Sequence, residues 1–320
     1  MPLFLSERDV AALLTMDEAL AAVEEAFRLH GLGRADNRPR QRPRLEHTLL
    51  QVMPAAVPGM GFGLKAYTVA SGGVRFVVLL WDEETGDLQA VIEAAHLGQM
   101  RTGAASGVAT RALARPDAAT VGIFGAGTQA PTQLEAVCAV RPIEHVWAYS
   151  PTPQHRQRFA ARMTERLGLP VQAVGAPRDV VADADIVITI TKASQPLFNG
   201  DWLPPGVHIN AAGSNRASAQ EIDPRTVERA DLVAIDDLAQ GQVEAGDLLH
   251  AQRQGRLRWD DVVPLGRVVA GRHPGRQRPD AITLFESLGV AIEDVAVARR
   301  VYQRALASGV GQPLPQTILG

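Results

Sequence analysis

The clearest chemical signature is a short glycine-containing stretch in the middle of the chain. Residues 121–130 read Val-Gly-Ile-Phe-Gly-Ala-Gly-Thr-Gln-Ala, which is an apolar run followed by G-x-G-x-x-A. In such a motif Gly125 allows a tight turn, Gly127 lets the backbone approach a pyrophosphate, and Ala130 lets the following helix pack closely on the sheet. The helix N-terminus adds N–H groups and a partial positive charge. The stretch therefore predicts a dinucleotide site rather than a merely structural turn.

The end of the next strand indicates which dinucleotide binds. An acid about 20 positions on would hold the ribose 2′-hydroxyl of NAD, but residues 149–152 read Tyr-Ser-Pro-Thr and contain no carboxylate. Ser150, Thr152, His155 and Arg156 are donors that could bind a 2′-phosphate instead. The alternative is a solvated helix start that does not discriminate. We predict that NADP(H) is favoured over NAD(H).

Two cations, Lys65 and Arg101, lie in apolar or small-residue segments that are expected to be buried. Lys65 interrupts an apolar segment, residues 61–67, and Arg101 lies in a predicted helix rich in alanine and glycine. Because a cation that becomes buried needs an anion, and because no acid lies at helical spacing from Arg101, its partner is either a remote acid or a ligand.

An arginine-rich stretch, residues 34–44, carries a third candidate. Its last arginine, Arg44, could turn inward and bind a carboxylate through two hydrogen bonds. The alternatives are a solvated loop and a nucleic-acid arm. The net charge of −3 and the aromatic content of 5% argue against nucleic acid.

Other chemistries find no support in the sequence. It contains no G-x-S-x-G, no Walker A loop and no H-E-x-x-H. The eight histidines do not pair at metal-ligand spacing, and the single cysteine, Cys138, excludes an intrachain disulfide and a cysteine-based zinc site. We therefore predict no metal.

The elements that must position these residues change in type along the chain. Before residue 116 the pattern predicts helices over 16–30 and 94–114 and strands over 49–53, 63–69 and 74–81, which form a largely antiparallel sheet. After residue 116, short apolar strands alternate with helices, which predicts a doubly wound parallel α/β (Rossmann) domain. Its strands are expected at 120–124, 145–150, 171–174, 186–190, 207–212 and 232–236, and its helices at 128–140 and 153–167. A loop over 267–280 and a helix over 291–307 follow.

Length and composition limit the classes of protein to which the chain can belong. The chain has 320 residues, 46% apolar and 21% charged, which excludes disorder as the main state and gives a prior of about two domains. Acidic residues near the start argue against a signal peptide, and the apolar runs are shorter than the roughly 18 residues of a membrane span. We expect a cytoplasmic protein that binds neither membrane nor nucleic acid.

The sequence resembles the ornithine cyclodeaminase and mu-crystallin family along nearly its whole length. The matching segments, in order, begin at Arg42, Met53, Gly63, Arg101, Gly125, His208, Glu244 and Thr283. The resemblance implies a homodimer whose smaller α+β domain, residues 1–116 completed by 295–320, binds substrate and forms the subunit contact. Residues 117–294 would form the dinucleotide-binding domain.

The resemblance also implies residue roles. Arg44, Lys65 and Arg101 would hold the carboxylate of an amino or imino acid, and we add a substrate contact for Leu288 and a cofactor contact for Arg101. The cofactor would be lined by further residues, which are Gly125, Gly127, Thr128, Gln129, Ser150, Thr152, Arg156, Thr191, Ile209, Asn210, Ala211, Ala212 and Ser287.

Departures from the family pattern bear on the activity. The cyclodeaminase and alanine dehydrogenase patterns carry an aspartate and a lysine where this chain has Asn215 and Ala219. An asparagine amide cannot act as a base near pH 7, so deamination loses its base, and an imine-reducing activity fits better.

We predict an NAD(P)H-dependent reductase of imino acids, such as cyclic ketimine carboxylates. Lys65 would tune protonation, and Asn215 would form a hydrogen bond near the substrate nitrogen. The alternatives are ornithine cyclodeamination to proline and ammonia with bound NAD, and a protein that holds NADPH and a small acid without turnover, as mu-crystallin does.

Overall fold

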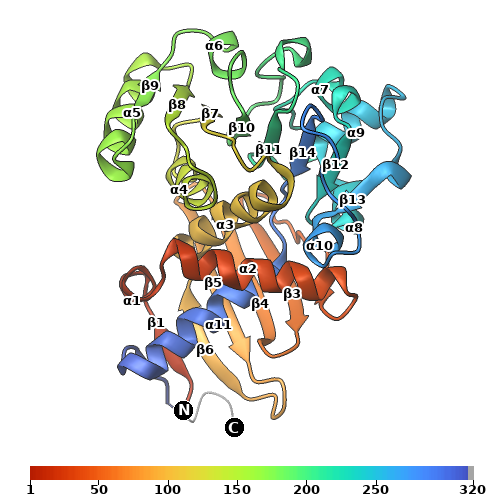
Figure 1. Ribbon diagram of the computed structural model, residues 1–320. Coiled ribbons are helices and arrows are strands. Elements are labelled where there is room, and N and C mark those ends of the chain that lie inside the picture. Colours follow the sequence, from red (N-terminus) through yellow and green to blue (C-terminus); the bar gives the residue numbers. More distant parts are fainter. Residues whose placement is uncertain (316–320) are drawn as a thin grey trace. The chain divides into compact units, whose positions relative to one another are not determined.

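The structure, a computed structural model, describes residues 1–315 (Figure 1). The chain divides into two compact units. The first contains Met1–Arg101 and the chain from Val290 on, and the second contains Thr102–Gly289. The predicted boundaries were residues 116 and 295, whereas the first division falls inside helix α3 (Ala95–Leu113). No helix within residues 1–315 combines the length and the apolar character that crossing a membrane requires.

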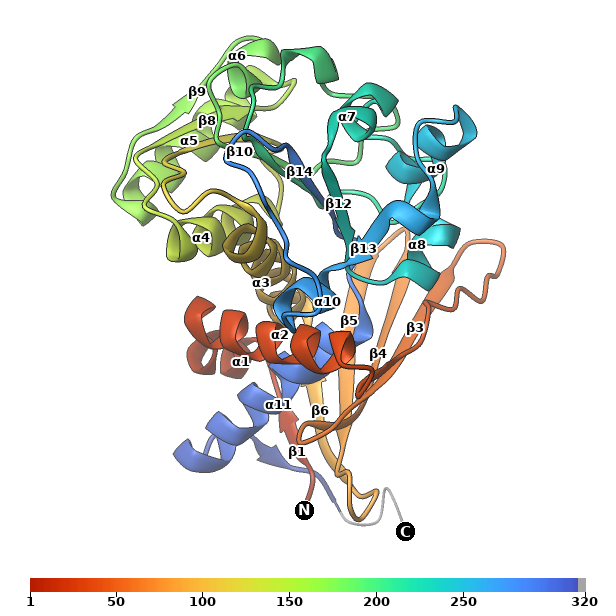
Figure 2. The ribbon, with the colours of Figure 1, turned by 45° about the vertical axis from the view of Figure 1, so that its right-hand side comes forward.

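The first unit is built on a seven-stranded sheet with the order β15-β1-β6-β5-β4-β3-β2. All neighbouring strands are antiparallel except β1 and β6. Helix α11 packs on β3, β4 and β5 and against α2 (Figure 2). The elements are β1 (Leu3–Leu5), α1 (Glu7–Leu13), α2 (Met16–Gly31), β2 (Asp36–Asn37), β3 (Leu49–Val57), β4 (Gly61–Ala70), β5 (Gly73–Trp81), β6 (Leu88–Glu93), α11 (Ala291–Ser308) and β15 (Gln312–Pro313).

Local sequence explains the main elements of this unit. Thr15 and Glu18 form a capping box at the start of α2. Strand β4 alternates buried and less buried residues, as expected for a sheet with one covered face. This alternation places Gly63, Lys65 and Tyr67 together on the covered face.

The second unit confirms the predicted doubly wound parallel sheet. Its eight strands are all parallel and have the order β13-β12-β14-β11-β10-β7-β8-β9. The strands are β7 (Thr120–Phe124), β8 (His145–Tyr149), β9 (Val171–Ala173), β10 (Ile186–Thr189), β11 (His208–Ala211), β12 (Leu232–Ile235), β13 (Val262–Pro264) and β14 (Thr283–Glu286). From β7 the chain proceeds outward to β8 and β9, then returns to the other side of β7 at β10. Such a reversal of strand order is where open α/β sheets bind ligands, at the carboxyl ends of the strands.

Helices connect these strands. They are α4 (Ala130–Val140), α5 (Pro153–Leu167), α6 (Arg178–Val181), α7 (Pro224–Arg229), α8 (Leu238–Glu244), α9 (Gly246–Arg253) and α10 (Leu265–Val269), with short 3₁₀ turns η1 (Gly200–Trp202) and η2 (Trp259–Asp261). Helix α5 has the predicted bounds, and Thr152 occupies its N-cap position, but the Thr152 side chain makes no capping hydrogen bond. Strands β13 and β14 were not predicted.

Candidate active site

A cluster of buried charges lies on the covered face of the first unit's sheet. Strand β4 carries Lys65, whose side chain is 3% exposed. Its Nζ donates a hydrogen bond to Oδ1 of Asp294 at 3.0 Å and lies 5.6 Å from the ring centroids of Tyr67 and Phe76. Asp294 belongs to the first turn of α11 and is buried. Lys65 therefore has a protein carboxylate as a partner.

The second member of this charge cluster is Arg101. Its Nη1 donates to Oε2 of Glu293 at 2.6 Å, and its Nε lies 3.1 Å from Oδ1 of Asp294. The sequence left open whether the partner of Arg101 is a remote acid or a ligand, and the structure supplies the remote acids. Both acids were missed from the sequence. Their signal is two adjacent carboxylates within the otherwise apolar run of residues 290–298.

The third cation of the cluster is Arg40 and not Arg44. Arg40 is buried and its Nε donates to Sδ of Met53 at 3.3 Å. Bridges between Gln41 and Val52 and between Arg44 and Leu49 show that this segment runs antiparallel to β3. Burial decreases along this segment, from the buried Arg40 to the exposed Arg44. Arg44 was expected to turn inward and does not.

Burial and neighbouring charges shift the pKa values within the charge cluster. Burial, with Arg101 and Arg40 nearby, lowers the pKa of Lys65 to about 8, and Asp294 opposes this. Burial raises the pKa of Glu293 to about 7 against the opposing effect of Arg101. Burial also disfavours the Arg101 cation, but Asp294 and Glu293 together raise the pKa of Arg101. At neutral pH the Lys65 and Arg101 cations thus face Asp294 and Glu293, and Glu293 is partly protonated. Buried ammonium and guanidinium groups of this kind can bind a carboxylate ligand through charge-assisted hydrogen bonds.

In the second unit, the predicted cofactor residues line up along the carboxyl edge of the sheet. Backbone hydrogen bonds join Gly125 to Tyr149, Ile190 to Phe124, Ala212 to Thr189 and Ser287 to Ala211. These bonds place Ser150, Thr191, Ala212 and Ser287 just beyond the ends of neighbouring strands.

The two motif glycines pass a direct test of fit to a dinucleotide. Gly125 has φ +119°, and a Cβ there would lie 2.5 Å from the carbonyl oxygen of Ile190. A Cβ on Gly127 would meet no protein atom within 4 Å, so the space beside its backbone is open to a pyrophosphate. The hydroxyl of Ser287 is buried and has no hydrogen-bond partner among the described residues. The motif, the open space and the unpaired hydroxyl all fit a bound dinucleotide.

The adenosine end of the predicted site contains no acid at the close of β8. Ser150 is buried, and Nη1 of Arg156 donates to the Ser150 carbonyl oxygen at 2.9 Å. The Arg156 guanidinium lies 5.6 Å from the ring centroid of Tyr149. Thr152 is exposed. The Arg156 guanidinium therefore lies between the backbone of Ser150 and the ring of Tyr149.

Several predicted contacts lie inside the core instead. Ile209, Asn210 and Ala211 form part of β11, which is buried on both faces. The Asn210 amide donates to Oγ1 of Thr110 at 2.9 Å, so this side chain makes a hydrogen bond within the core. The reason is that β11 is a central strand that ends at Ala211, and of the four predicted residues only Ala212 lies beyond its end. The side chain of Leu288 also packs in the second unit's core, and its predicted substrate contact stays a prediction.

Asn215 lies in the loop after β11. It is half-buried and lines a pocket of about 300 Å³ together with Lys192, Gly213, Ser214, Arg216 and Ala219. The catalytic role predicted for it, like the cofactor contact predicted for Arg101, stays a prediction.

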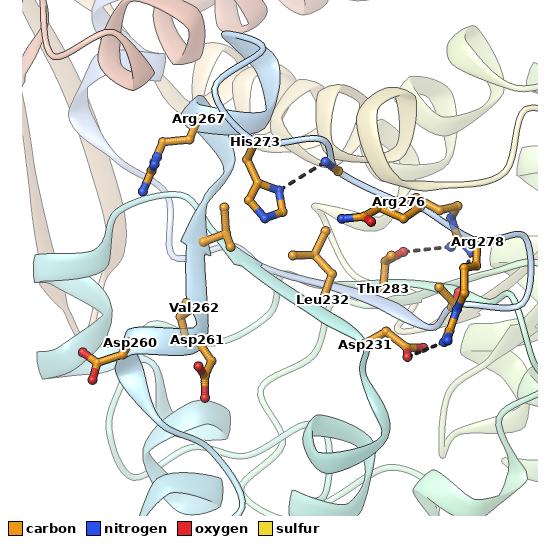
Figure 3. A pocket seen from close by; sticks show the side chains of 14 residues that line it. Asp231, Leu232, Asp260, Asp261, Val262, Arg267, His273, Arg276, Arg278 and Thr283 are labelled. Carbon is orange, nitrogen blue, oxygen red and sulfur yellow. Dashed lines mark hydrogen bonds and ion pairs between the residues drawn. The ribbon is translucent and has the colours of Figure 1, made fainter.

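A larger hollow, of about 580 Å³, lies at the opposite edge of the second unit's sheet (Figure 3). It opens beside Leu232 and Thr283, the first residues of β12 and β14. Arg278 is paired there with Asp231 at 2.8 Å, and Arg276 donates to backbone carbonyls and to Thr283. These arginines hold the loop over residues 271–282 in place, at the edge away from the strand ends where such sheets bind ligands.

Comparison with known proteins places these features in context. A model of the ornithine cyclodeaminase/mu-crystallin family matches residues 1–309. A Δ1-pyrroline-2-carboxylate reductase of Bacillus cereus is 37% identical over 276 residues, which cover 83% of this chain and 85% of that protein.

Solved structures agree over almost the whole chain. The Δ1-pyrroline-2-carboxylate reductase of Thermococcus litoralis, in complex with NADH and L-proline, has a TM-score of 0.93 at 35% identity and covers 98% of this chain and 100% of its own. An archaeal alanine dehydrogenase dimer with bound NAD has a TM-score of 0.92 at 36% identity and covers 98% and 99%.

Proposed function

Because the chain belongs to the ornithine cyclodeaminase/mu-crystallin family, we propose that it is an oxidoreductase that reduces imino acids to amino acids with a nicotinamide dinucleotide. The substrates are cyclic ketimine carboxylates or related acids with a C=N bond. The observation that carries this proposal is the buried charge cluster of the first unit, in which Asp294 and Glu293 hold the Lys65 and Arg101 cations close together. The relatives that reduce Δ1-pyrroline-2-carboxylate support the same substrate class.

Lys65 and Arg101 hold the substrate carboxylate, and Asp294 and Glu293 keep the two cations in place from the helix α11 side. The reduced nicotinamide, when bound, supplies a hydride to the imine carbon. The imine nitrogen gains a proton, and the Lys65 ammonium, with its pKa lowered to about 8, is the group suited to supply it. Asn215 donates or accepts a hydrogen bond at the nitrogen but takes no proton.

The cofactor preference that we propose is NADP(H) over NAD(H). This preference is supported by the end of β8, where the chain has Ser150 with Arg156 against its backbone and no carboxylate of the kind that holds the ribose 2′-hydroxyl of NAD. Ser150→Asp is expected to shift the ratio of kcat/KM values toward NADH, because the new carboxylate repels a 2′-phosphate. An unchanged ratio would remove this preference from the proposal.

We also propose a homodimer, supported by the dimeric archaeal alanine dehydrogenase. Light scattering on the purified protein at several concentrations measures its mass. A monomer's mass at every concentration contradicts a dimer.

The activity is tested by mixing the purified protein with NADPH or NADH and Δ1-pyrroline-2-carboxylate and following the nicotinamide absorbance. We expect consumption with this acid and none with Δ1-pyrroline, which lacks the carboxylate. Ornithine with NAD serves to detect cyclodeamination through ammonia release. If dinucleotide binds but neither cyclic nor open-chain imino acids consume it, the reductase proposal is wrong, and if ornithine also releases no ammonia the protein is a ligand-holding protein.

A further inference from the structure

The carboxyl edge of the second unit's sheet is assembled around one buried carboxylate, Glu221. Its Oε1 accepts from the backbone N–H of Thr191 at 2.6 Å and from Oγ1 of Thr191 at 2.7 Å. Its Oε2 accepts from the backbone N–H of Gly213 at 2.7 Å and from Oγ1 of Thr189 at 3.0 Å. Glu221 is 0% exposed. A single side chain therefore ties the loop after β10 to the loop after β11.

The position of Glu221 is itself held by a second acid. Oδ1 of Asp247, in α9, accepts from the backbone N–H of Glu221 at 2.7 Å and of Ile222 at 2.9 Å. A Cβ on Gly213 would lie 2.4 to 2.5 Å from the Glu221 carboxylate oxygens. The carboxylate thus occupies the space that any side chain at position 213 would need.

Thr191 connects this arrangement to the cofactor edge. Its hydroxyl donates to Glu221 and accepts from the backbone N–H of Ala193 at 3.1 Å. Both the rotamer of Thr191 and the path of the backbone through residues 191–193 are therefore set by Glu221. The same carboxylate sets the backbone at Gly213, directly after Ala212.

We propose that Glu221 is a positioning residue for the dinucleotide: by accepting four hydrogen bonds it holds the loops at Thr191 and Gly213 in the form that binds the cofactor. This inference rests on the proposed function. Glu221 touches neither substrate nor cofactor in this role, and it acts through the two loops.

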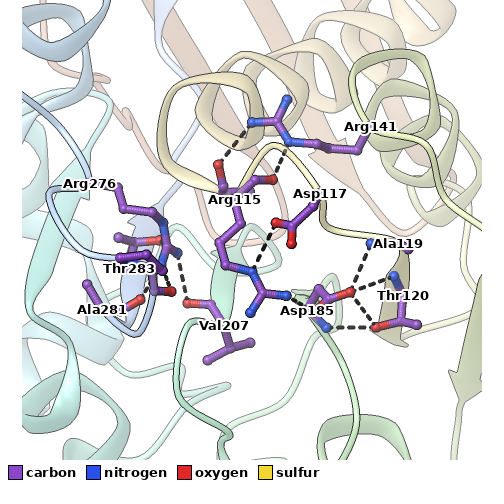
Figure 4. Close-up of polar contacts among 12 residues, drawn as sticks. Arg115, Asp117, Ala119, Thr120, Arg141, Asp185, Val207, Arg276, Ala281 and Thr283 are labelled. Atoms are coloured by element: carbon purple, nitrogen blue, oxygen red, sulfur yellow. Dashed lines mark hydrogen bonds and ion pairs between the residues drawn. The ribbon is translucent and has the colours of Figure 1, made fainter.

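The chain offers a matched control at the other edge of the same sheet. Oδ2 of Asp185 accepts from the backbone N–H groups of Ala119 and Thr120 at 2.9 and 3.0 Å and from Oγ1 of Thr120 at 2.9 Å, and Asp185 pairs with Arg115 (Figure 4). It ties the start of β7 to the start of β10. Asp185 therefore makes the same kind of bonds as Glu221, but at the edge away from the predicted cofactor residues.

The experiment compares Glu221→Gln with Asp185→Asn. In each variant the new NH₂ group replaces a carboxylate oxygen that accepted hydrogen bonds, and it faces the same donors without being able to accept from them. Both variants should therefore melt at a lower temperature than the parent protein. Only Glu221→Gln should weaken binding of NADPH and NADH, measured by calorimetric titration without substrate, by about tenfold or more, since hydrogen bonds to a charged group are lost. KM for the dinucleotide should rise in parallel, and KM for the imino acid should change far less.

A milder variant covers the case in which Glu221→Gln does not fold. Thr189 is fully buried and donates only to Oε2 of Glu221 among the bonds found for its side chain in the described part of the chain. Thr189→Val removes this one donor, and dinucleotide binding should weaken by a few-fold, about the value of one hydrogen bond.

The outcomes separate this inference from the proposed function. If the parent protein binds neither dinucleotide, the proposed function is wrong and the inference falls with it. If the parent binds but Glu221→Gln or Thr189→Val binds equally well, or if Asp185→Asn weakens binding to the same extent, Glu221 is only a structural residue and the inference alone is overturned.

Discussion

At the residue scale, Lys65 has the least ordinary surroundings. It is one of two lysines in the chain, and it is buried beside Asp294 with Arg101 and Arg40 nearby. Breaking a buried ion pair by removing one partner costs about 3–5 kcal/mol, because an uncompensated charge remains. Asp294 and Glu293 therefore compensate the charges of Lys65 and Arg101, so these cations can stay buried in the absence of a substrate carboxylate.

Replacing Lys65 with methionine tests its role directly. Lys65→Met should lower kcat/KM for the imino acid by roughly 10²- to 10⁴-fold, the usual contribution of a positioned proton donor, and should leave dinucleotide binding unchanged. Arg75→Met, which removes an exposed cation on β5, is the control and should keep full activity. A change in affinity for the acid without a change in turnover would instead favour the ligand-holding alternative.

The acidity of Lys65 predicts a pH dependence. Because its pKa is lowered to about 8, the ammonium is present below that pH and is lost above it, so kcat/KM should fall as the pH rises through about 8. Asp294 raises the pKa of Lys65, so Asp294→Asn should move the falling limb of the pH–rate profile to lower pH. A limb that stays in place in Asp294→Asn would show that another group titrates.

At the element scale, the elements with local signals were predicted well. Helix α5 begins at Pro153 and ends at Leu167 as expected, and β7 spans the predicted residues. The glycine motif was also readable, because its role depends on neighbours in sequence. In contrast, the ion pairs of the charge cluster join residues 192 and 229 positions apart. No local pattern specifies such partners.

The choice between Arg40 and Arg44 shows a second limit of prediction from the sequence. Both arginines lie in the same extended segment, and the sequence does not state where this segment leaves the covered face. The bridges to β3 decide this, since they place Arg40 beside Met53 and Arg44 beyond the buried part. Likewise, the burial of Ile209 and Asn210 follows from β11 being a central strand, which only the strand order reveals.

In the turn from β7 to α4, alanine substitutions at Gly125 and Gly127 should have different effects on the melting temperature and on dinucleotide binding. Gly127→Ala meets no protein atom, so it should leave the melting temperature of the free protein unchanged and weaken dinucleotide binding. Gly125→Ala combines a positive φ with a contact at 2.5 Å, so it should lower the melting temperature by itself. Thermal melts with and without NADPH measure both effects. Equal melting temperatures and equal NADPH binding in the two variants would contradict this reading of the turn.

At the scale of the whole molecule, the first unit is made from both ends of the chain and the second is one continuous stretch. A chain that ends at residue 289 would lack α11 with both acids of the charge cluster. We expect its first 101 residues to be digested readily in limited proteolysis, because β3, β4 and β5 lose the helix that covers them. Residues 102–289 should still bind dinucleotide. A protease-resistant N-terminal fragment would contradict this expectation.

The return of α11 to the first unit also has a consequence for biosynthesis. The ribosome releases Lys65 and Arg101 long before it translates Glu293 and Asp294, so the nascent N-terminal segment emerges with cations and apolar strands that have no cover. The second unit, whose residues emerge consecutively, can fold first while the N-terminal segment is still incomplete. Chaperone binding during translation should therefore concentrate on the early part of the polypeptide and end only when the last helix has left the exit tunnel.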